Sequence, residues 1–255
     1  MNAEAPRPLP EPRPLPGFDT VALFLDLDGT LAAIKPRPSD VGPEAWRTAL
    51  LRRLQEKLDG RLAVISGRSL EEVDRILEGA VTAVAAVHGL VRRRADGVVE
   101  QAPPAEGLPA ARSVLDELAA RHPGMVVEDK TLSVAVHFRQ APELADEVRR
   151  EAEAIAADTG LRLQLGDMVA ELCTPGFDKG SAVRAFLREA PFLAALPVFV
   201  GDDLTDENGF RAARAVGGVS VLVGPSRATA ADLRLEDVAA VRAWLEASLM
   251  QDSPA

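Results

Sequence analysis

With 255 residues, of which 47% are hydrophobic and 27% charged, the chain has the composition of an ordinary globular protein of one or two domains. Its formal net charge is −10, and its densest basic run is only Arg92–Arg94. This balance disfavours a nucleic-acid partner, which would need a large positive surface. No apolar run approaches the roughly 20 residues of a membrane span, so we expect no membrane partner either.

The cysteine count and the N-terminus both bear on location. Cys173 is the single cysteine, so no internal disulfide can form, and a reducing compartment fits. Residues 1–16 are rich in proline and lack the charged-then-apolar pattern of a secretion signal. We expect a cytoplasmic protein and a monomer, in which residues 1–16 form a disordered tail without a catalytic role.

Strand and helix patterns alternate along the first part of the chain. The predicted strands are residues 21–25, 61–65 and 82–87, and the predicted helices are residues 44–57 and a segment capped by Ser69. The same alternation returns near the C-terminus, with strands at 196–200 and 219–223 and helices at 208–215 and 238–249. Such alternation predicts an α/β domain formed by residues 17–104 and 173–250, with a parallel sheet covered by helices on both faces.

Residues 105–172 follow a different pattern, which begins after prolines and a glycine typical of a linker. The predicted order is helix, two strands, helix and two strands, at residues 110–121, 125–128, 132–139, 142–157, 161–165 and 168–172. Runs of this kind favour an antiparallel sheet carrying helices. The segment is therefore predicted to be an α+β domain inserted into the α/β domain.

The most informative stretch is the apolar run that ends in Asp26 and Asp28 and continues with Gly29 and Thr30. Two carboxylates two residues apart on an extended chain point to the same side. At the carboxyl end of a parallel strand they lie where open α/β sheets bind ligands. A turn with one capping aspartate would explain Asp28 but not Asp26. A calcium-binding EF-hand loop is disfavoured, because Leu31 and Arg37 stand where that loop needs Gly and Glu.

Three further polar positions follow other predicted strands or open a predicted helix: Ser66, Lys179 and the pair Asp202–Asp203. Each alone would more often be a turn residue, a surface lysine or a capping pair. Together with Asp26 and Asp28, they resemble the four motifs of the haloacid-dehalogenase (HAD) superfamily of phosphotransferases, in the order of that superfamily. The resemblance implies a Rossmann-like HAD core and identifies residues 105–172 as the larger, C2-type cap domain of some members.

The resemblance also implies a role for each of these residues. Asp26 is expected to be the nucleophile that forms an aspartyl-phosphate, and Asp28 the general acid and base. Ser66 and Lys179 are expected to bind the transferring phosphoryl group. Carboxylates gathered around a phosphate dianion repel one another, so a cation is needed, and Mg²⁺ suits oxygen ligands. Its expected ligands are Asp26, Asp202 and the Asp28 carbonyl, with Asp203 as a ligand or as a residue that orients one.

A narrower resemblance concerns the substrate. The segments from Glu128 to Arg139, Gly201 to Glu207 and Val84 to Gly89 are similar to segments of trehalose-6-phosphate phosphatases. This resemblance implies hydrolysis of trehalose 6-phosphate, as a step of trehalose biosynthesis. The residues expected to bind this sugar phosphate are Glu128, Lys130, Glu171, His88, Gly89 and Arg68. The family usually has a basic residue in the stretch after Glu171, where this chain has Cys173.

Other functions stay open at this point. A sucrose-phosphate or mannosyl-phosphoglycerate phosphatase would share the core and a similar cap. A phosphomannomutase would share Asp26 and Asp28 but return the phosphoryl group to a sugar. A module that binds sugar phosphates without catalysis would usually have lost an aspartate of the first motif or the lysine, and this chain has both.

Overall fold

The computed structural model describes residues 9–15, 17–166 and 168–251. Contacts divide the chain into two compact units, of which one comprises residues 1–100 and 178–255 and the other residues 101–177. We refer to them as the core unit and the inserted unit. From the sequence we expected the insertion at residues 105–172, within the second of these ranges.

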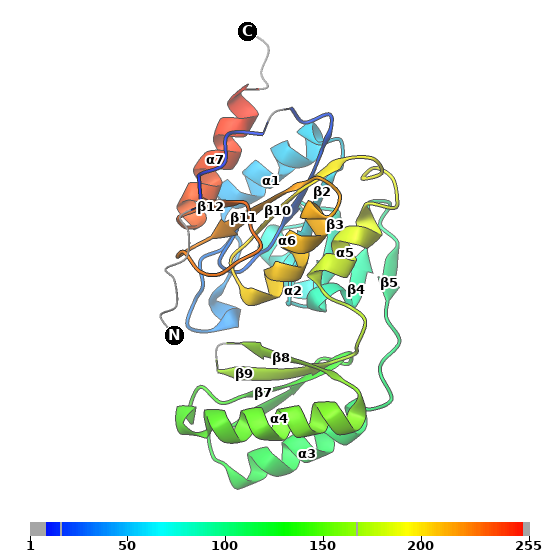
Figure 1. Ribbon diagram of the computed structural model, residues 1–255, viewed down its shortest axis with the longest axis vertical. Helices are drawn as coiled ribbons and strands as arrows, with labels where there is room; N and C mark the ends of the chain where they lie inside the picture. Colours follow the sequence, from blue (N-terminus) through cyan, green and yellow to red (C-terminus); the bar gives the residue numbers. More distant parts are fainter. Residues whose placement is uncertain (1–8, 16, 167, 252–255) are drawn as a thin grey trace. The chain divides into compact units, whose positions relative to one another are not determined.

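The core unit contains a large sheet and its covering helices (Figure 1). Its strands are β1 (Val21–Leu25), β2 (Leu62–Ile65), β3 (Ala83–Ala86), β4 (Val91–Arg93), β5 (Val99–Gln101), β10 (Leu196–Gly201), β11 (Val219–Val223) and β12 (Leu233–Leu235). Its helices are α1 (Ala45–Lys57), α2 (Leu70–Leu77), α5 (Lys179–Phe186), α6 (Glu207–Arg214) and α7 (Val238–Gln251), with short 3-10 helices η1 (Pro38–Asp40), η2 (Val87–Gly89) and η4 (Leu204–Asp206).

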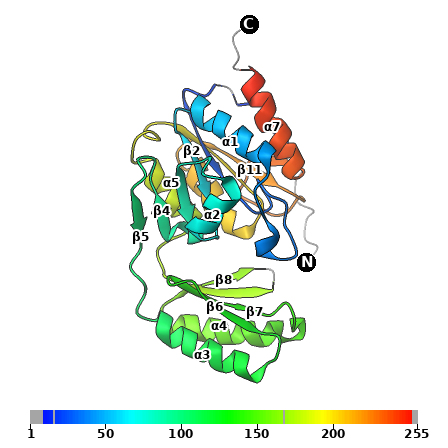
Figure 2. The same ribbon diagram turned by 180° about the vertical axis from the view of Figure 1, so that it is seen from behind.

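The strand order in this sheet is β12-β11-β10-β1-β2-β3-β4-β5. The pairs from β12 to β3 are parallel, and β4 runs antiparallel to β3. Helices α5 and α6 cover one face, and α1, α2 and α7 lie on the other (Figures 1 and 2). Because β1 is covered on both sides, all five of its residues are buried, which explains its uninterrupted apolar sequence. The predicted α/β domain with helices on both faces is confirmed.

An aromatic cluster joins β1 to α5. The ring centroids of Phe24 and Phe192 lie 5.5 Å apart, and those of Phe186 and Phe192 lie 5.1 Å apart. All three rings are fully buried. Each such ring stabilises the fold by roughly 1.5–3 kcal/mol through removal of its apolar surface from water. This packing holds β1, which leads into Asp26, against the C-terminal end of α5, the helix that begins with Lys179.

Part of the N-terminal tail is ordered, contrary to our prediction from the sequence. Leu15 is buried, and its backbone N–H donates to the hydroxyl of Ser248 on α7. The carbonyl of Arg13 accepts a hydrogen bond of 2.8 Å from the Trp244 indole, and the carbonyl of Pro10 accepts one from the Arg234 N–H. Proline-rich backbone lacks internal hydrogen bonds, so its carbonyls are available to such donors. Residues 1–8 and 16 of the predicted tail lie outside the described residues.

The inserted unit is an antiparallel sheet with two helices on one face (Figure 1). Its elements are α3 (Leu108–Arg121), β6 (Val126–Asp129), β7 (Ser133–His137), the 3-10 helix η3 (Pro142–Leu144), α4 (Ala145–Thr159), β8 (Arg162–Gly166) and β9 (Val169–Cys173). The strand order is β6-β7-β9-β8. The predicted order of helices and strands is confirmed. Alternate strand residues such as Val134, Val136 and Leu172 pack with the helices, which leaves the other row of side chains on the open face.

Two differences from the predicted elements have local causes. The helix predicted from residue 142 begins at Ala145, because Pro142 starts a single 3-10 turn ahead of it. Strand β12 was not predicted, since its three residues are too few to show an alternating pattern. Among the helices that the structure describes, none is sufficiently long and apolar to span a bilayer.

Candidate active site

The polar residues predicted at strand ends meet at one edge of the core sheet. Asp26 directly follows β1, Ser66 directly follows β2, and Asp202 directly follows β10. These three strands are neighbours in the order β10-β1-β2 and run parallel. Their carboxyl ends therefore lie side by side, where ligands bind to open α/β sheets.

Lys179 reaches this edge from the first position of α5. The helix begins there because Asp178 is its N-cap, and the Asp178 carboxylate accepts a hydrogen bond of 2.6 Å from the Ser181 N–H. The Lys179 side chain is 4% exposed, and its Nζ atom lies 2.7 Å from both Asp26 Oδ1 and Asp206 Oδ1. Burial opposes the charge on Lys179, but the carboxylates of Asp206 and Asp26 raise its pKa. Lys179 therefore stays a cation at physiological pH.

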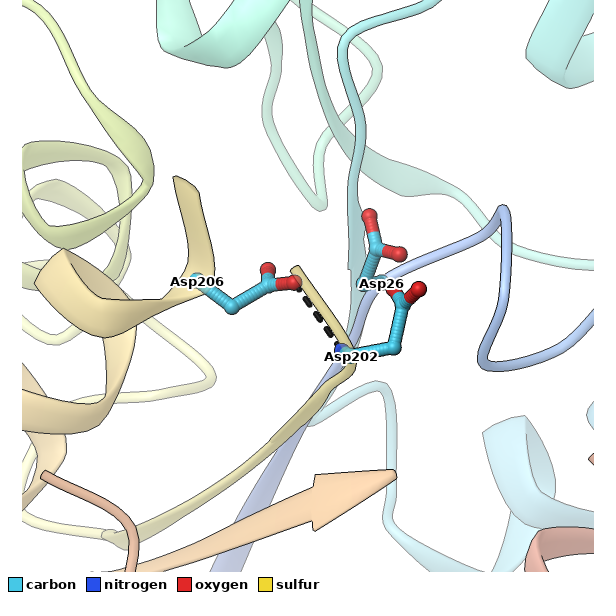
Figure 3. Close-up of side chains that lie close together, drawn as sticks. All are labelled: Asp26, Asp202 and Asp206. Carbon is cyan, nitrogen blue, oxygen red and sulfur yellow. Dashed lines mark hydrogen bonds between the residues drawn. The ribbon is translucent and has the colours of Figure 1, made fainter. Parts of the chain in front are cut away.

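Three carboxylates gather beside this lysine. One oxygen each of Asp26, Asp202 and Asp206 lies within 4.8 Å of the others, and Figure 3 shows the three residues close together, with Asp206 hydrogen-bonded to the Asp202 N–H. Burial, opposed by the Lys179 charge and reinforced by those of Asp206 and Asp202, raises the pKa of Asp26 well above its usual value. Burial and the Asp206 charge raise the pKa of Asp202 to about 7. The Oδ1 atom of Asp202 is buried and has no hydrogen-bond partner among the described residues. An oxygen-binding cation would relieve both the repulsion and this missing contact.

Gly29 allows the loop after β1 to approach Asp202 closely. A Cβ atom at Gly29 would lie 2.0 Å from Asp202 Oδ2, which is far inside contact distance. Its φ of +83° also falls in the region that glycine adopts without strain. The glycine of the first motif is thus required for the two acidic loops to meet.

Asp203, expected as a metal ligand or as a residue that orients one, lies outside the carboxylate cluster of Asp26, Asp202 and Asp206. Its exposed side chain caps η4 and accepts a hydrogen bond of 2.6 Å from the Leu204 N–H. Sequence reasoning missed Asp206, which is fully buried and takes the third position. The single turn of η4 returns Asp206 to the start of the loop, where its Oδ2 accepts hydrogen bonds from the Asp202 and Asp203 N–H groups. The four-residue spacing of Asp202 and Asp206 was the available signal.

Arg68 binds Asp28. Its Nε and Nη2 atoms donate to the two oxygens of the Asp28 carboxylate at 2.6 and 2.7 Å, and Nη1 donates to Glu72 and to the Pro38 carbonyl. A forked pair of this kind holds the carboxylate in one orientation. Arg68 was expected among the residues that bind substrate; in this structure its partners are protein groups.

Ser66, His88 and Gly89 lie near one another on neighbouring loops. Ser66 is buried, its Oγ accepts a hydrogen bond of 3.2 Å from the Arg68 N–H, and its carbonyl accepts one from the His88 N–H.

His88 packs closely on its neighbours. A Cβ atom at Gly67 would lie 2.5 Å from His88 Nε2, so the imidazole ring packs directly on this glycine. His88 itself has a φ of 56°, an uncommon and strained conformation for a residue with a side chain. Gly89 faces the carbonyl of Asp178, the residue before Lys179.

The inserted unit brings together its own three predicted residues on the face of its sheet opposite the helices. Glu128 and Glu171 share a row across β6, β7 and β9, and Lys130 Nζ lies 3.9 Å from Glu128 and 3.5 Å from Glu171. Ser133 donates a hydrogen bond of 2.5 Å to Glu171. His137 was considered only a strand residue, but its Nε2 atom lies 2.9 Å from Glu128 Oε2. That hydrogen bond, opposed by burial, lowers the pKa of Glu128.

Comparison with known proteins agrees with this arrangement. Residues 24–239 match the family described as Trehalose-phosphatase. The chain is 41% identical over 227 residues to the trehalose-6-phosphate phosphatase of Escherichia coli K12, which covers 88% of this chain and 85% of that protein. It is 36% identical over 241 residues to a trehalose-phosphate phosphatase of Mycolicibacterium paratuberculosis, covering 88% of this chain and 61% of that longer protein.

Solved structures share the fold. A crystal structure of a trehalose-6-phosphate phosphatase related protein has a TM-score of 0.73 at 28% identity, over 91% of this chain and 97% of its own. The C-terminal domain of the C. albicans trehalose-6-phosphate phosphatase has a TM-score of 0.80 at 19% identity, over 92% and 94%, and supports the fold alone. The match over most of the chain, together with the ordered HAD motifs at one sheet edge, shows that this chain belongs to the trehalose-phosphatase family.

Proposed function

We propose that this protein hydrolyses trehalose 6-phosphate to trehalose and inorganic phosphate. The observation that carries this proposal is the buried group in which Lys179 joins Asp26 and Asp206 beside Asp202, in a chain of this family. A phosphate dianion needs a nucleophile and compensating positive charge, and this group supplies an oxygen nucleophile next to a fixed cation.

Asp26 is the proposed nucleophile. One of its oxygens attacks phosphorus while the bond between phosphorus and the sugar oxygen breaks, and an aspartyl-phosphate forms. Asp28, in its protonated form, gives its proton to the departing sugar oxygen. A water molecule then attacks phosphorus, Asp28 takes a proton from it, and Asp26 is released together with phosphate. In the ionised form, the forked contact with Arg68 keeps the Asp28 carboxylate oriented to take the proton of the attacking water.

Lys179 and Ser66 are proposed to bind the oxygens of the transferring group. Lys179 is already held by two carboxylates at 2.7 Å, so it needs little reorganisation when the charge on the phosphoryl group shifts. The Ser66 hydroxyl lies at the end of the neighbouring strand and can donate a hydrogen bond, because its Oγ acts as acceptor toward Arg68.

The cofactor we propose is Mg²⁺. The donor set fits this ion, because it consists of carboxylate oxygens, one of which is buried without a partner among the described residues. Asp26 and Asp202 would hold it, together with the Asp28 carbonyl. Asp206 already accepts hydrogen bonds from Lys179 and two backbone N–H groups, so its role is to hold these groups. When bound, the ion supplies positive charge against the phosphate and the carboxylates.

Recognition of the sugar is proposed for Glu128, Lys130 and Glu171, with His88 and Gly89 in the core unit. Two carboxylates and an ammonium group provide acceptors and donors for sugar hydroxyls. All three lie on the polar face that the helices of the inserted unit leave uncovered. We further propose that the inserted unit serves as the cap domain, and that the protein acts as a cytoplasmic monomer on this small-molecule substrate.

A panel of sugar phosphates tests the proposed substrate. Purified protein with Mg²⁺ should release phosphate from trehalose 6-phosphate with a kcat/KM at least tenfold above those for sucrose 6-phosphate, glucose 6-phosphate and mannosyl phosphoglycerate. A higher value for one of these would assign another sugar phosphatase activity. Transfer of phosphate between positions of a sugar, without release, would indicate a mutase. Binding of the panel without any turnover would indicate a module that only binds.

A further inference from the structure

Arg227 lies outside the four motifs, yet its side chain reaches the loop that carries Asp202. It belongs to residues 224–232, the loop between β11 and β12. Strands β10 and β11 are parallel neighbours, so this loop emerges beside the loop after β10 at the same edge of the sheet. The Arg227 side chain is 23% exposed and therefore mostly enclosed by these two loops.

The contacts of Arg227 are with backbone carbonyls and with one carboxylate. Its Nη2 atom donates to the carbonyls of Asp202 and Asp203, at 3.2 and 2.9 Å. Its Nη1 atom donates to the Glu207 carboxylate and, at 3.2 Å, to the Ala228 carbonyl. One guanidinium thus joins three segments: residues Asp202 and Asp203 after β10, which we call the acidic loop, the start of α6, and its own loop. The planar fork of guanidinium donors permits this.

The same two residues of the acidic loop are held from their other side by Asp206, which accepts hydrogen bonds from the Asp202 and Asp203 N–H groups. Their N–H groups thus bind Asp206, and their carbonyls bind Arg227. Binding both backbone polar groups of Asp202 restrains its backbone dihedral angles, and with them the direction of its Cα–Cβ bond. This matters because the oxygens of Asp26, Asp202 and Asp206 lie within 4.8 Å of one another, and like charges at this distance repel.

Glu207 in turn holds the guanidinium in place. Its carboxylate, 11% exposed, also accepts hydrogen bonds of 2.7 Å from the Thr229 hydroxyl and 2.8 Å from the Ala230 N–H. Burial alone would raise the pKa of Glu207, but these hydrogen bonds and the one from Arg227 lower it. Glu207 is therefore an anion that fixes both Arg227 and the loop from which it comes.

We propose that Arg227 is a positioning residue for the metal-binding carboxylate of Asp202. This inference rests on the proposed function only in taking Asp202 as a ligand of the divalent cation. Without Arg227, the carbonyls of Asp202 and Asp203 form hydrogen bonds to water instead, and the loop samples other conformations. The carboxylates are then no longer pre-arranged for the ion. Groups that orient metal ligands in this way typically change metal affinity by 10–100-fold when they are removed.

The test compares Arg227→Ala with Arg214→Ala. Arg214 is the matched control, because it contacts the same loop through the Ala230 carbonyl at 2.8 Å and Asp232 at 3.1 Å, and neither of these partners belongs to the acidic loop. The readout needs no substrate: it is the Mg²⁺ concentration that gives half of the maximal rise in Tm of the metal-free protein. Arg227→Ala should raise this concentration about tenfold, and Arg214→Ala should change it less than twofold.

Activity gives a second, independent readout. With Arg227→Ala, excess Mg²⁺ should restore most of kcat, and KM for trehalose 6-phosphate at saturating Mg²⁺ should stay within about twofold of the wild type. If Arg227→Ala does not fold, Arg227→Lys and Glu207→Gln replace it, and each should raise the half-saturating Mg²⁺ concentration at least threefold. An unchanged value in the folded variants, or an equal change in Arg214→Ala, would overturn the inference. A wild-type protein that Mg²⁺ does not stabilise would instead overturn the proposed cofactor.

Discussion

Lys179 and Asp206 form a buried ion pair at 2.7 Å, and Asp206 is fully enclosed by protein. The pair makes Asp206 a structural partner of Lys179 as well as a member of the acidic cluster. Because Asp206 also binds two backbone N–H groups of its own loop, a single carboxylate links α5 to the loop after β10. The positions of Lys179 and Asp202 therefore depend on each other.

Replacement of Asp206 by Asn tests this dependence. The variant keeps the size of the side chain but leaves Lys179 with only one carboxylate, so we expect a loss of about 3–5 kcal/mol in the free energy of unfolding. Phosphate release should fall at least tenfold. Asp203→Asn is the matched control from the same loop, because Asp203 is exposed and only caps η4, and it should cost no more than about 2 kcal/mol. Equal losses in the two variants in urea titrations would contradict the assigned role of Asp206.

Replacement of Asp26 by Asn tests the nucleophile. The amide has the shape of the carboxylate but cannot form an acyl phosphate under these conditions, so phosphate release should fall on the order of 10³-fold or more. The fold should persist, because the amide side chain keeps an oxygen that can accept a hydrogen bond from Lys179. Circular dichroism and Tm of the purified variant provide the control for folding. More than a trace of remaining activity toward trehalose 6-phosphate would exclude Asp26 as the nucleophile.

Much of this site could be predicted because its residues lie at the ends of regular elements. Asp26, Ser66 and Asp202 each follow a buried strand directly, and the parallel arrangement of these strands brings the three together. Glu128 and Glu171 meet because strand pairing places them in one row. Periodicity and parallel pairing are properties that a sequence pattern records.

The residues that sequence reasoning missed act through tertiary contacts. Asp206 becomes buried only because η4 turns the chain back onto Lys179. Arg227 binds backbone carbonyls, which any residue offers, so no side-chain pattern marks its partners. Residues 9–15 have a composition typical of disorder, and their order depends on donors from Trp244, Arg234 and Ser248. Local composition contains no information on such distant partners.

The acidic cluster should make the stability of the metal-free protein depend on pH. The pKa of Asp202 is about 7 in the folded protein, against an ordinary value of 3.8, so the folded state binds more protons than the unfolded state between these values. Stability in chelator should therefore fall as pH rises from about 4 to about 7. Asp202→Asn removes the penalised charge, and at pH 8 it should raise Tm in chelator by roughly 2–8 °C, equivalent to about 1–2 kcal/mol.

Addition of Mg²⁺ should reverse the order of the Tm values of the wild type and Asp202→Asn. At pH 8, Mg²⁺ should raise the Tm of the wild type but change that of Asp202→Asn little, because the variant lacks one of the proposed ligands. Excess chelator should abolish phosphate release by the wild type, and Mg²⁺ should restore it. Ca²⁺ should substitute poorly, because its larger and looser coordination is less suited to the in-line geometry of phosphoryl transfer. Full activity in excess chelator would contradict the need for a metal ion.

Glu128 and Lys130 allow a test of substrate recognition that compares two substrates on the same variant. A loss of correctly folded protein lowers both kcat/KM values equally and therefore cancels from their ratio. If they bind only the sugar, Glu128→Ala or Lys130→Ala should lower kcat/KM for trehalose 6-phosphate about tenfold or more, as expected for the loss of a charged hydrogen bond of about 1.5–3 kcal/mol. The same variants should barely change kcat/KM for p-nitrophenyl phosphate, which has no sugar hydroxyls. The measured quantity is the ratio of the two kcat/KM values for each variant.

The control for this ratio is Glu153→Ala, which removes an exposed carboxylate from α4, the helix on the other face of the same sheet. It should leave the ratio within about twofold of the wild-type value. His137→Ala should lower the ratio less than Glu128→Ala does, because the contact of His137 at 2.9 Å is with Glu128, the proposed sugar-binding residue. Equal losses on both substrates for Glu128→Ala and Lys130→Ala would mean that these residues support folding or the chemical step. Binding energy from the part of the substrate that does not react would then have to come from other residues.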